Sequence, residues 1–311
     1  MTNKIVLFLI LITACFSSCG GNNNAPDVDD DDAQVEEVKE FERSNDLLKD
    51  LTTIQESKKL KIWVSAHRCN TYKGINLSIP ENSLPAIKYA ISCGADMIEV
   101  DLRSTKDGVI VNMHNPTINT TTNGKETLAN ITYEELCQYN LRIGNTLTKY
   151  KVPRLEEILD EAKDKIYVCM DIKEPALLDK IIEIVSAKGM INQVCYYTGD
   201  ESIYLDQLLM LNKDCVLFPW AGDVSTVNKL ASKYPTLKLV TLSVDNDNLK
   251  EVMTAVRNNK LVGYANHTQH DDELINKQYT SLQLFINNKV NVVLTNYPDL
   301  AISYLKAKKL R

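Results

Sequence analysis

The sequence predicts an α/β fold, a (β/α)8 (TIM) barrel with a small β-hairpin and insertion after the second strand. The chain has 311 residues, 44% hydrophobic and 24% charged, which is ordinary for a globular protein and leaves room for one barrel of about 250 residues. Short apolar runs of strand length alternate with helical patterns. Eight of these runs look buried on both faces, as barrel strands are.

The expected elements alternate regularly along the chain. The strands cover residues 63–68, 97–102, 167–173, 194–197, 216–220, 239–244, 261–266 and 290–296. Helical periodicity covers residues 84–92, 155–162, 177–188, 204–211, 224–234, 248–258 and 272–287. A doubly wound open sheet is the alternative, but no glycine-rich dinucleotide turn follows the first strand. We expect one barrel domain over residues 58–311.

The first residues are typical of an export signal. Lys4 is followed by a short apolar run over residues 5–14, and Cys19 precedes Gly20 and Gly21. The run is too short to span a membrane. Residues 1–19 therefore resemble a signal peptide with a bacterial lipobox, which implies cleavage before Cys19 and lipid attachment to it. Simple secretion with cleavage nearby is the alternative.

Residues 20–45 are rich in Asn, Asp and Glu and contain little apolar surface, which predicts a disordered acidic tether. The expected product is an exported lipoprotein, anchored to the bacterial outer membrane or facing the periplasm or cell surface. Its lipid anchor would be its only contact with the membrane. The net charge of −6 and the mixed charge distribution argue against a nucleic-acid partner.

The cysteines indicate no metal-binding or redox motif. None of the eight forms a CxxC pair, which excludes a zinc ribbon or thioredoxin motif. Export would permit disulfides, whereas Cys169 and Cys195 lie in apolar strand-like runs where cysteine often packs as a small hydrophobic residue. The pairing stays open.

One extra β run does not fit the barrel count. Residues 109–114 follow the second strand too closely for a parallel crossover, which needs about a dozen residues. Asp107-Gly108 is a signal for a tight antiparallel hairpin. A two-residue loop would place His114 opposite either Glu99 or Asp101, beside two carboxylates in both registers.

Polar side chains gather where three strands end. Glu99 and Asp101 are two residues apart in the second strand, so they share a face. Two like charges this close suit a hard cation, although an acidic pair facing solvent is the simpler alternative. His67-Arg68 ends the first strand and combines a proton carrier with a guanidinium that can bind phosphate.

The third expected strand ends in Asp171 and Lys173, again on one face. Barrel geometry brings these strand ends around one pocket, where barrel active sites are built. Histidines, acids and cations together suit phosphodiester cleavage, because cations stabilise the anionic phosphate while histidines transfer protons. His267 and His270 have no third ligand nearby and are expected to lie in a loop.

These residues resemble one known family, the glycerophosphodiester phosphodiesterases. The matching segments, in order, are His67-Arg68, Pro80-Glu81-Asn82-Ser83, residues 94–101, residues 105–108, His114, Thr121-Thr122, Gly124 and the closing Leu294-Thr295-Asn296-Tyr297-Pro298. Shorter matches lie between residues 131 and 157. The resemblance implies a TIM barrel that hydrolyses glycerophosphodiesters to sn-glycerol 3-phosphate and an alcohol, with a divalent cation.

The resemblance also implies roles for individual residues. Glu99, Asp101 and Asp171 would hold the metal, Ca²⁺ or Mg²⁺. His67 and His114 would form the acid–base pair, which would pass through a cyclic phosphate, and the order in which they act stays open. Arg68 and Lys173 would bind the phosphate. Glu81 would support the residues that bind the metal and the phosphate.

The chain departs from the family pattern at several positions. Cys69 stands where glycine is usual, Asn115 and Asn296 where aspartate is usual, and Asp171 where glutamate is usual. Residues 263–266 replace a segment that normally contains tryptophan. No departure removes a proposed catalytic group, and the altered late strands bear on the substrate more than on the reaction class.

Two other functions remain as alternatives. A phospholipase C-type lyase on the same barrel would stop at the cyclic phosphate. A catalytically inactive lipoprotein would bind a phosphorylated ligand without turning it over.

Residues 117–150 form an insertion that could cover the site.

Overall fold

The computed structural model describes residues 43–197, 199, 202–242 and 248–311. The predicted signal peptide with Cys19, nearly all of the predicted tether, and residues 243–244 of the sixth expected strand lie outside the described residues. The described residues belong to one compact unit, Arg43–Arg311. This unit begins before the barrel boundary expected from the sequence.

Eight parallel strands form a barrel, as predicted. The ring runs in the order β8-β7-β6-β2-β1-β11-β10-β9. Beyond β8, a parallel bridge joins Trp220 to Thr241 of β9, and the Thr241 amide donates to the Pro219 carbonyl at 2.9 Å. These contacts join the segment after β8 to β9, so the two strands at the ends of this order meet. The strands are β1 (Trp63–Ala66), β2 (Met97–Ser104), β6 (Tyr167–Ile172), β7 (Val194–Tyr197), β8 (Val216–Leu217), β9 (Leu239–Leu242), β10 (Val262–Asn266) and β11 (Val292–Thr295).

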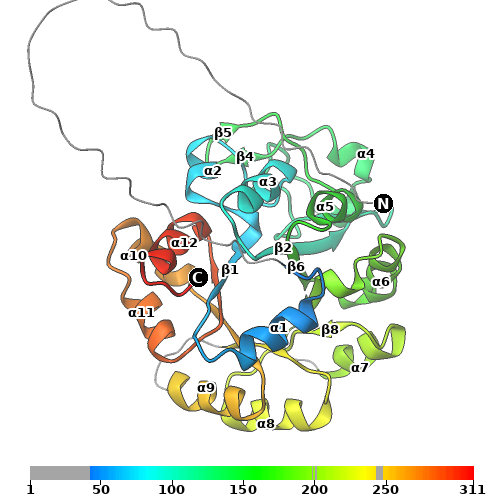
Figure 1. Cartoon of the computed structure of the whole chain (residues 1–311). Coiled ribbons are helices and arrows are strands. Elements are labelled where there is room, and N and C mark those ends of the chain that lie inside the picture. The colour runs from blue at the N-terminus through cyan, green and yellow to red at the C-terminus, as the bar shows by residue number, and fades with distance from the viewer. Residues whose placement is uncertain (1–42, 198, 200–201, 243–247) are drawn as a thin grey trace, which may run out of the picture. The chain divides into compact units, whose positions relative to one another are not determined.

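Helices surround this ring in Figure 1. Those packed around the barrel are α3 (Leu84–Ser92), α5 (Leu155–Ala162), α6 (Leu178–Ala187), α7 (Ser202–Leu211), α8 (Val224–Lys233), α9 (Leu249–Asn258), α11 (Thr280–Asn287) and α12 (Pro298–Ala307). The shorter α2 (Tyr72–Asn76), α4 (Tyr133–Leu136) and α10 (Asp271–Ile275) lie between strands in the chain. The 3-10 turns in the described part of the chain are η1 (His67–Cys69), η2 (Leu128–Asn130), η3 (Pro175–Leu177), η4 (Ile191–Gln193) and η5 (Thr268–His270).

Local sequence explains where the helices begin and which face they bury. The Ser83 hydroxyl caps α3 by accepting from the Ala86 amide at 3.3 Å. In α5 the buried residues Leu155, Ile158, Leu159 and Ala162 recur at helical spacing and form one apolar face. The predicted helix over 272–287 is wrong as one element: α10 ends at Ile275 and α11 begins at Thr280. Lys277 and Tyr279 between them have positive φ, which no continuous helix contains.

Side chains fill the barrel interior. Trp63 and Tyr167 stack with ring centroids 5.5 Å apart, and the Tyr264 hydroxyl donates to Ser65 at 2.9 Å. Cys169 of β6 faces Cys195 of β7 in register. The six cysteines in the described part of the chain are free thiols, so disulfides play no part in this barrel.

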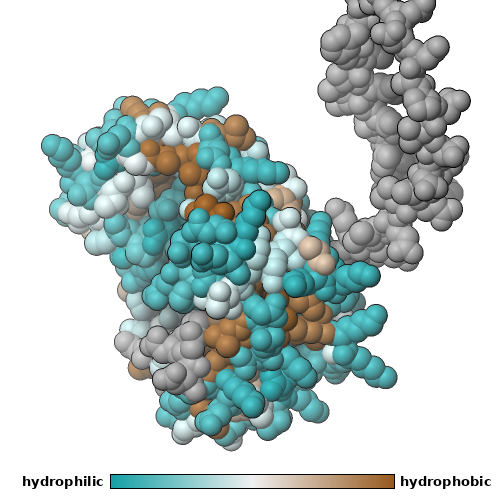
Figure 2. All heavy atoms as spheres, turned by 90° about the vertical axis from the view of Figure 1, so that its left-hand side faces the viewer, coloured by the Kyte–Doolittle hydropathy of each residue, from teal (hydrophilic) through white to brown (hydrophobic). Residues whose placement is uncertain are grey.

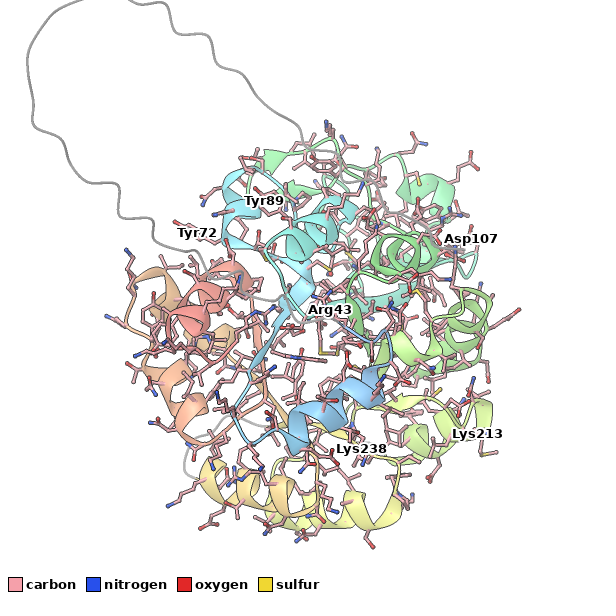
Figure 3. The ribbon with its side chains drawn as sticks, in the orientation of Figure 1. Arg43, Tyr72, Tyr89, Asp107, Lys213 and Lys238 are labelled. Atoms are coloured by element: carbon pink, nitrogen blue, oxygen red, sulfur yellow. The ribbon has the colours of Figure 1, made fainter. Side chains whose placement is uncertain are left out.

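An N-terminal helix that the sequence analysis did not assign, α1 (Leu47–Glu56), covers the end of the barrel where the strands begin. Its apolar residues Leu47, Leu51 and Ile54 are buried. The Tyr167 hydroxyl, at the start of β6, donates to Asp50 of α1 at 2.6 Å. Just before the helix, the Arg43 guanidinium, labelled in Figure 3, donates to the carbonyls of Ala95 and Lys165, which precede β2 and β6.

The hairpin after β2 exists, but neither predicted register is correct. β3 (Ile110–Asn112) pairs antiparallel with β2, with Leu102 opposite Asn112 and Ser104 opposite Ile110. The loop contains three residues because Gly108 adopts a left-handed conformation with φ of 75°. A regular continuation would put His114 opposite Val100, on the face away from Glu99 and Asp101. Instead the strand ends at Asn112, and a bend at His114 redirects the side chain.

The insertion over residues 117–150 packs around a second apolar cluster. Ile118, Leu128, Leu136 and Leu141 contact Val111 and Met113 around the end of β3 in this cluster. A two-stranded ladder of β4 (Arg142–Ile143) and β5 (Thr146–Leu147) completes the insertion. That the insertion covers the site stays a prediction.

The surface seen in Figure 2 is mainly hydrophilic, with hydrophobic side chains in separate patches. Large apolar residues with high exposure, Leu77, Ile203 and Met210, belong to α2 or its end and to α7. Among the helices of the described residues, none has the length and apolar character needed to span a membrane.

Candidate active site

The site begins where β1 ends. Arg68 and Cys69 in the turn η1 have φ of 50° and 59°, so the backbone reverses sharply after His67. This reversal brings the Arg68 amide to Glu99, to which it donates at 2.8 Å. The turn therefore orients one carboxylate of β2 with a backbone donor.

Three predicted carboxylates gather on neighbouring strands. Asp101 of β2 lies directly in register with Asp171 of β6, and Glu99 lies two residues before Asp101 on the same face. One oxygen from each of the three lies within 4.8 Å of the others. The parallel register thus accounts for this cluster.

The carboxylates in this cluster have different pKa shifts. Burial, with added repulsion from Asp101 and Asp171, raises the pKa of Glu99 well above its usual value. Burial and the Asp101 charge also raise the pKa of Asp171, although Lys173 opposes them. Burial acts the same way on Asp101, but Lys173 and an Asn82 hydrogen bond outweigh it and lower the pKa of Asp101. Burial and mutual repulsion thus disfavour the charged forms of Glu99 and Asp171, whereas Lys173 and Asn82 favour the charged form of Asp101.

Two cations border the carboxylates. The Lys173 ammonium lies 2.5 Å from Asp171 Oδ2 and 3.0 Å from Asp101 Oδ1. Although burial would lower the pKa of Lys173, these two carboxylates raise it, so Lys173 is a cation. Arg68 Nη1 lies 3.0 Å from Glu81 Oε1, and its Nε lies 3.7 Å from Asp101 Oδ2. Both side chains are partly exposed, so they can reach an anionic group at this end of the barrel.

Each candidate histidine has its Nδ1 beside an asparagine oxygen. His67 Nδ1 lies 2.7 Å from Asn296 Oδ1, and His114 Nδ1 lies 2.7 Å from Asn115 Oδ1. Because an amide oxygen only accepts, Nδ1 of each ring carries the proton and Nε2 of the neutral ring has a free lone pair. Burial lowers the pKa of His67 despite its hydrogen bond to Asn296, so this ring is neutral at neutral pH.

His114 completes the set at the same end of the barrel. Its charge, when protonated, would lower the pKa of both Asp101 and Asp171, which places the ring near these two carboxylates. The Arg103 guanidinium donates to the His114 carbonyl at 2.8 Å and holds the bend. The structure therefore brings all the predicted site residues together except Cys19, which lies outside the described residues.

The donor set fits a hard divalent cation. Three carboxylates with oxygens within 4.8 Å of one another provide the ligands that calcium and magnesium prefer. The raised pKa of Glu99, caused by burial and by two neighbouring carboxylates, indicates a place where added positive charge would be favourable.

Comparison with known proteins agrees with this geometry. The model of the glycerophosphoryl diester phosphodiesterase family matches residues 72–281. The chain belongs to this family. A glycerophosphodiester phosphodiesterase from Caldanaerobacter subterraneus is 33% identical over 134 residues, which cover 40% of this chain and 53% of that protein. The chain thus aligns with about half the length of this curated relative.

Solved structures of glycerophosphoryl diester phosphodiesterases share the fold. One from Parabacteroides distasonis superposes with a TM-score of 0.74 at 20% identity, covering 84% of this chain and 92% of that one. A phosphodiesterase from Oleispira antarctica, solved in complex with its product sn-glycerol-3-phosphate, superposes with a TM-score of 0.63 at 17% identity, covering 78% and 96%. Both the predicted fold and the predicted family are confirmed.

Three of the departures from the usual pattern of the glycerophosphodiester phosphodiesterases, Asn115, Asn296 and Cys69, lie beside the proposed catalytic groups. Asn115 and Asn296 contact the two histidines directly. Cys69 keeps a left-handed conformation that glycine would adopt freely, and its buried thiol lies 3.6 Å from the Glu99 carbonyl. Burial, with the nearby carboxylates, raises the pKa of this thiol well above its usual value, so it is an unreactive thiol.

Sequence reasoning missed several supporting residues. The Asn82 side chain donates to Asp101 at 2.9 Å, and the Asn112 oxygen accepts from the Asp101 amide at 2.9 Å. Asn82 is part of the matching segment Pro80-Glu81-Asn82-Ser83. Its backbone is left-handed, with φ of 54°, and its side chain reaches the Asp101 carboxylate. Asp271 and His267 were also missed, because the segment after β10 was expected to be an ordinary loop.

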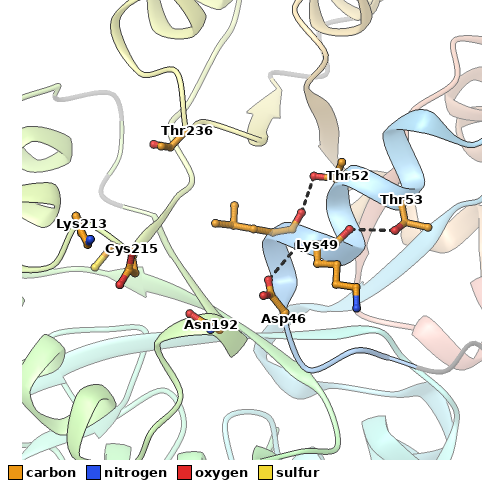
Figure 4. Close-up of a pocket in the computed structure, with 10 residues that line it drawn as sticks. Asp46, Lys49, Thr52, Thr53, Asn192, Lys213, Cys215 and Thr236 are labelled. Carbon is orange, nitrogen blue, oxygen red and sulfur yellow. Dashed lines mark hydrogen bonds between the residues drawn. The ribbon is translucent and has the colours of Figure 1, made fainter.

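A cavity of about 680 Å³ lies at the opposite end of the barrel (Figure 4). Its lining includes Asp46, Thr52 and Thr53 of α1 and its cap, and Asn192 before β7. The Thr52 and Thr53 hydroxyls donate to carbonyls within α1, and Asp46 caps the helix through the Lys49 amide. Because these polar groups already serve the helix, and no site residue lines the cavity, we assign the chemistry to the other end.

Proposed function

We propose that this chain is a divalent-metal-dependent phosphodiesterase that hydrolyses glycerophosphodiesters to sn-glycerol 3-phosphate and an alcohol. One observation carries the proposal: two histidines, each with Nδ1 engaged by an asparagine oxygen, lie at the same barrel end as three carboxylates, Arg68 and Lys173. Family membership supports the reaction class. The Oleispira antarctica enzyme with its bound sn-glycerol-3-phosphate supports the product.

The residues divide the work between binding and proton transfer. Arg68 and Lys173 would bind the phosphate oxygens, and Glu81 would hold Arg68 in place through their 3.0 Å contact. Glu99, Asp101 and Asp171 would hold Ca²⁺ or Mg²⁺, which when bound would neutralise negative charge on the phosphate. The alternatives of a lyase or an inactive binding protein predict different products from the same diesters.

His67 is the better candidate for the first proton acceptor, because its lowered pKa, caused by burial, keeps it neutral. Its Nε2 would take the proton of a glycerol hydroxyl as that oxygen bonds to phosphorus. Protonated His114 would give its proton to the departing alcohol oxygen as the bond from that oxygen to phosphorus breaks. Water would then open the cyclic phosphate, with the two rings exchanging roles.

We further propose that the chain is an exported lipoprotein attached through Cys19, as its N-terminal sequence suggests. Replacing Cys19 with Ser should leave the precursor without lipid and release the protein from the membrane fraction. Mass spectrometry of the mature N-terminus checks this. An unlipidated wild-type N-terminus beginning elsewhere would rule out the anchor.

The function is tested by measuring sn-glycerol 3-phosphate released by the full chain from a panel of glycerophosphodiesters, with calcium, with magnesium and with a chelator. Metal-dependent release is the expected result. A cyclic phosphate as the end product would instead indicate the lyase, and binding of diesters without turnover would indicate the inactive lipoprotein.

Replacing His67 or His114 with Ala should lower kcat by about 10²- to 10⁴-fold, the usual contribution of a general acid or base. The unfolding midpoint should stay close to that of the wild type, because both rings lie at the rim of the barrel. His270→Gln, in a half-buried histidine outside the site, is the matched control. Wild-type turnover in both alanine variants would contradict the assigned roles.

A further inference from the structure

A buried carboxylate, Asp271, lies beside the site and takes no part in the proposed chemistry. It is the first residue of α10 and is 5% exposed. Its oxygens accept from the Thr295 hydroxyl, from the Asn296 amide at 2.8 Å and from His267 Nδ1 at 3.2 Å. A buried carboxylate is costly unless it is paired with such donors, so this residue has a specific structural task.

Two of the three donors, Thr295 and Asn296, belong to the segment that leaves β11, and the third, His267, follows β10. The Thr295 hydroxyl, held by Asp271, also accepts from the Tyr297 amide at 3.1 Å. The Asn296 peptide is therefore fixed on both sides, by Asp271 at its own amide and by Thr295 at the next. The His267 amide donates to the Leu294 carbonyl at 2.8 Å, which ties the two loops together.

Asn296 connects this buried group to the candidate base. Its side-chain oxygen lies 2.7 Å from His67 Nδ1. A continuous series of hydrogen bonds thus runs from His267 through Asp271 and Asn296 to His67. Among the described residues, Nε2 of the fully buried His267 has no hydrogen-bond partner, so Asp271 holds this ring by Nδ1 while Phe285 packs against its face or edge.

The second histidine is supported differently. Asn115, which contacts His114, donates through its side-chain nitrogen to the Thr120 hydroxyl at 2.9 Å, at an exposed position. His67 therefore has a buried, charged support, whereas His114 has a neutral one at the surface. This difference is expected if the orientation of His67 has to be maintained closely.

We propose that Asp271 is a positioning residue for the reaction: by clamping the backbone of Asn296, it keeps the asparagine oxygen on His67 Nδ1 and so keeps Nε2 free as the proton acceptor. This inference rests on the proposed function. Asp271 touches neither substrate nor the reacting atoms, and it acts only through Asn296.

The test compares Asp271→Asn with Asp272→Asn, an exposed neighbour on the same helix. Loss of the carboxylate should lower kcat about 10- to 100-fold, as expected when a reacting group is misplaced, with little change in KM. Asp272→Asn should have wild-type kinetics. Unchanged kcat in Asp271→Asn, or an equal loss in Asp272→Asn, would overturn the proposal.

A double-variant cycle distinguishes positioning from a general structural role. If Asp271 acts through Asn296, Asp271→Asn should cost little further kcat in an Asn296→Ala background, because the contact to His67 is already lost. Multiplying effects in the double variant would refute the coupling. If Asp271→Asn does not fold, Thr295→Val replaces it, because this variant removes one donor to the Asp271 carboxylate. Thr295→Val should also lower kcat. An unchanged kcat in this variant would count against the proposal.

A second readout does not depend on turnover. The chain has four histidines, so ¹⁵N-histidine labelling with one substitution per ring would assign the imidazole nitrogens. His67 should be the Nδ1–H tautomer in the wild type and should lose this preference in Asp271→Asn. Wild-type protein without turnover but with this dependence would refute the proposed function and retain the positioning role. A tautomer unaffected by Asp271→Asn would refute the positioning role itself.

Discussion

His67 and His114 are held in the same way, each by the amide oxygen of an asparagine on Nδ1. A neutral amide fixes the tautomer, but it stabilises an imidazolium less than a carboxylate would. Burial lowers the pKa of His67, and Asn296 does not reverse that shift. His67, held by Asn296, is thus suited to act as a base, because it stays neutral at pH values below the usual histidine pKa.

This arrangement predicts a pH dependence. As pH falls, His67 becomes protonated only below its ordinary pKa of 6.5, because burial lowers its pKa, so the acid limb of kcat/KM should lie below pH 6.5. Asn296→Asp would place a negative charge beside the imidazolium and raise the pKa of His67, which should move the limb to higher pH. pH–rate profiles of both proteins check this, with exposed Asn228→Asp as the control. A limb unmoved by Asn296→Asp would contradict the assignment of His67 as base.

Sequence reasoning located the candidate groups that lie together at the strand ends but not the residues that contact and hold them. Glu99, Asp101 and Asp171 follow from strand periodicity and from the way barrel strands end at one rim. Asn296 is 229 residues from His67, so no local pattern links them. Asp271 looks like one more acid in a polar loop, because its role depends on donors from the neighbouring strand.

At the scale of elements, α1 and the hairpin mark the limits of periodicity. The hairpin was expected from Asp107-Gly108, but one residue in a left-handed conformation changed the loop length and moved the register by one. Helix α1 was missed although Leu47, Leu51 and Ile54 recur at helical spacing, because it precedes the first strand and fits no βα unit. Periodicity within an element therefore predicted neither the length of the hairpin loop nor a helix that precedes the first strand.

Helix α1 should contribute to stability and not to turnover. Leu51 is fully buried, so Leu51→Ala should lower the free energy of unfolding by about 2–5 kcal/mol, the usual cost of such a cavity. The kcat of the folded variant should match the wild type, because α1 covers the barrel end away from the site. Denaturant titration measures the first quantity. Glu56→Ala, exposed on the same helix, is the control, and a Leu51→Ala variant as stable as that control would mean that α1 is not packed as described.

At the scale of the whole molecule, an ion held by the three-carboxylate cluster would couple metal binding to stability. An ion bound by the folded state alone stabilises it by about 2.7 kcal/mol at a hundred times its Kd, or roughly 5–10 °C in Tm for a domain of this size. We therefore expect calcium or magnesium to raise Tm and a chelator to reverse the rise.

Glu99→Gln should remove most of this rise, since it takes away one of the three clustered carboxylates. Thermal unfolding at increasing metal concentration provides the measurement. Glu183→Gln, at an exposed position on α6, should respond to metal as the wild type does. A Tm independent of metal in the wild type would remove the basis for a resident cation.

The contact between His67 and Asn296 crosses the seam where β1 pairs with β11, the first and last strands of the barrel. It cannot form until nearly the whole chain has been assembled, and such distant contacts form slowly. During refolding, compaction and helix content should therefore recover before turnover does. The onset of catalysis would then report the moment at which the first and last strands meet.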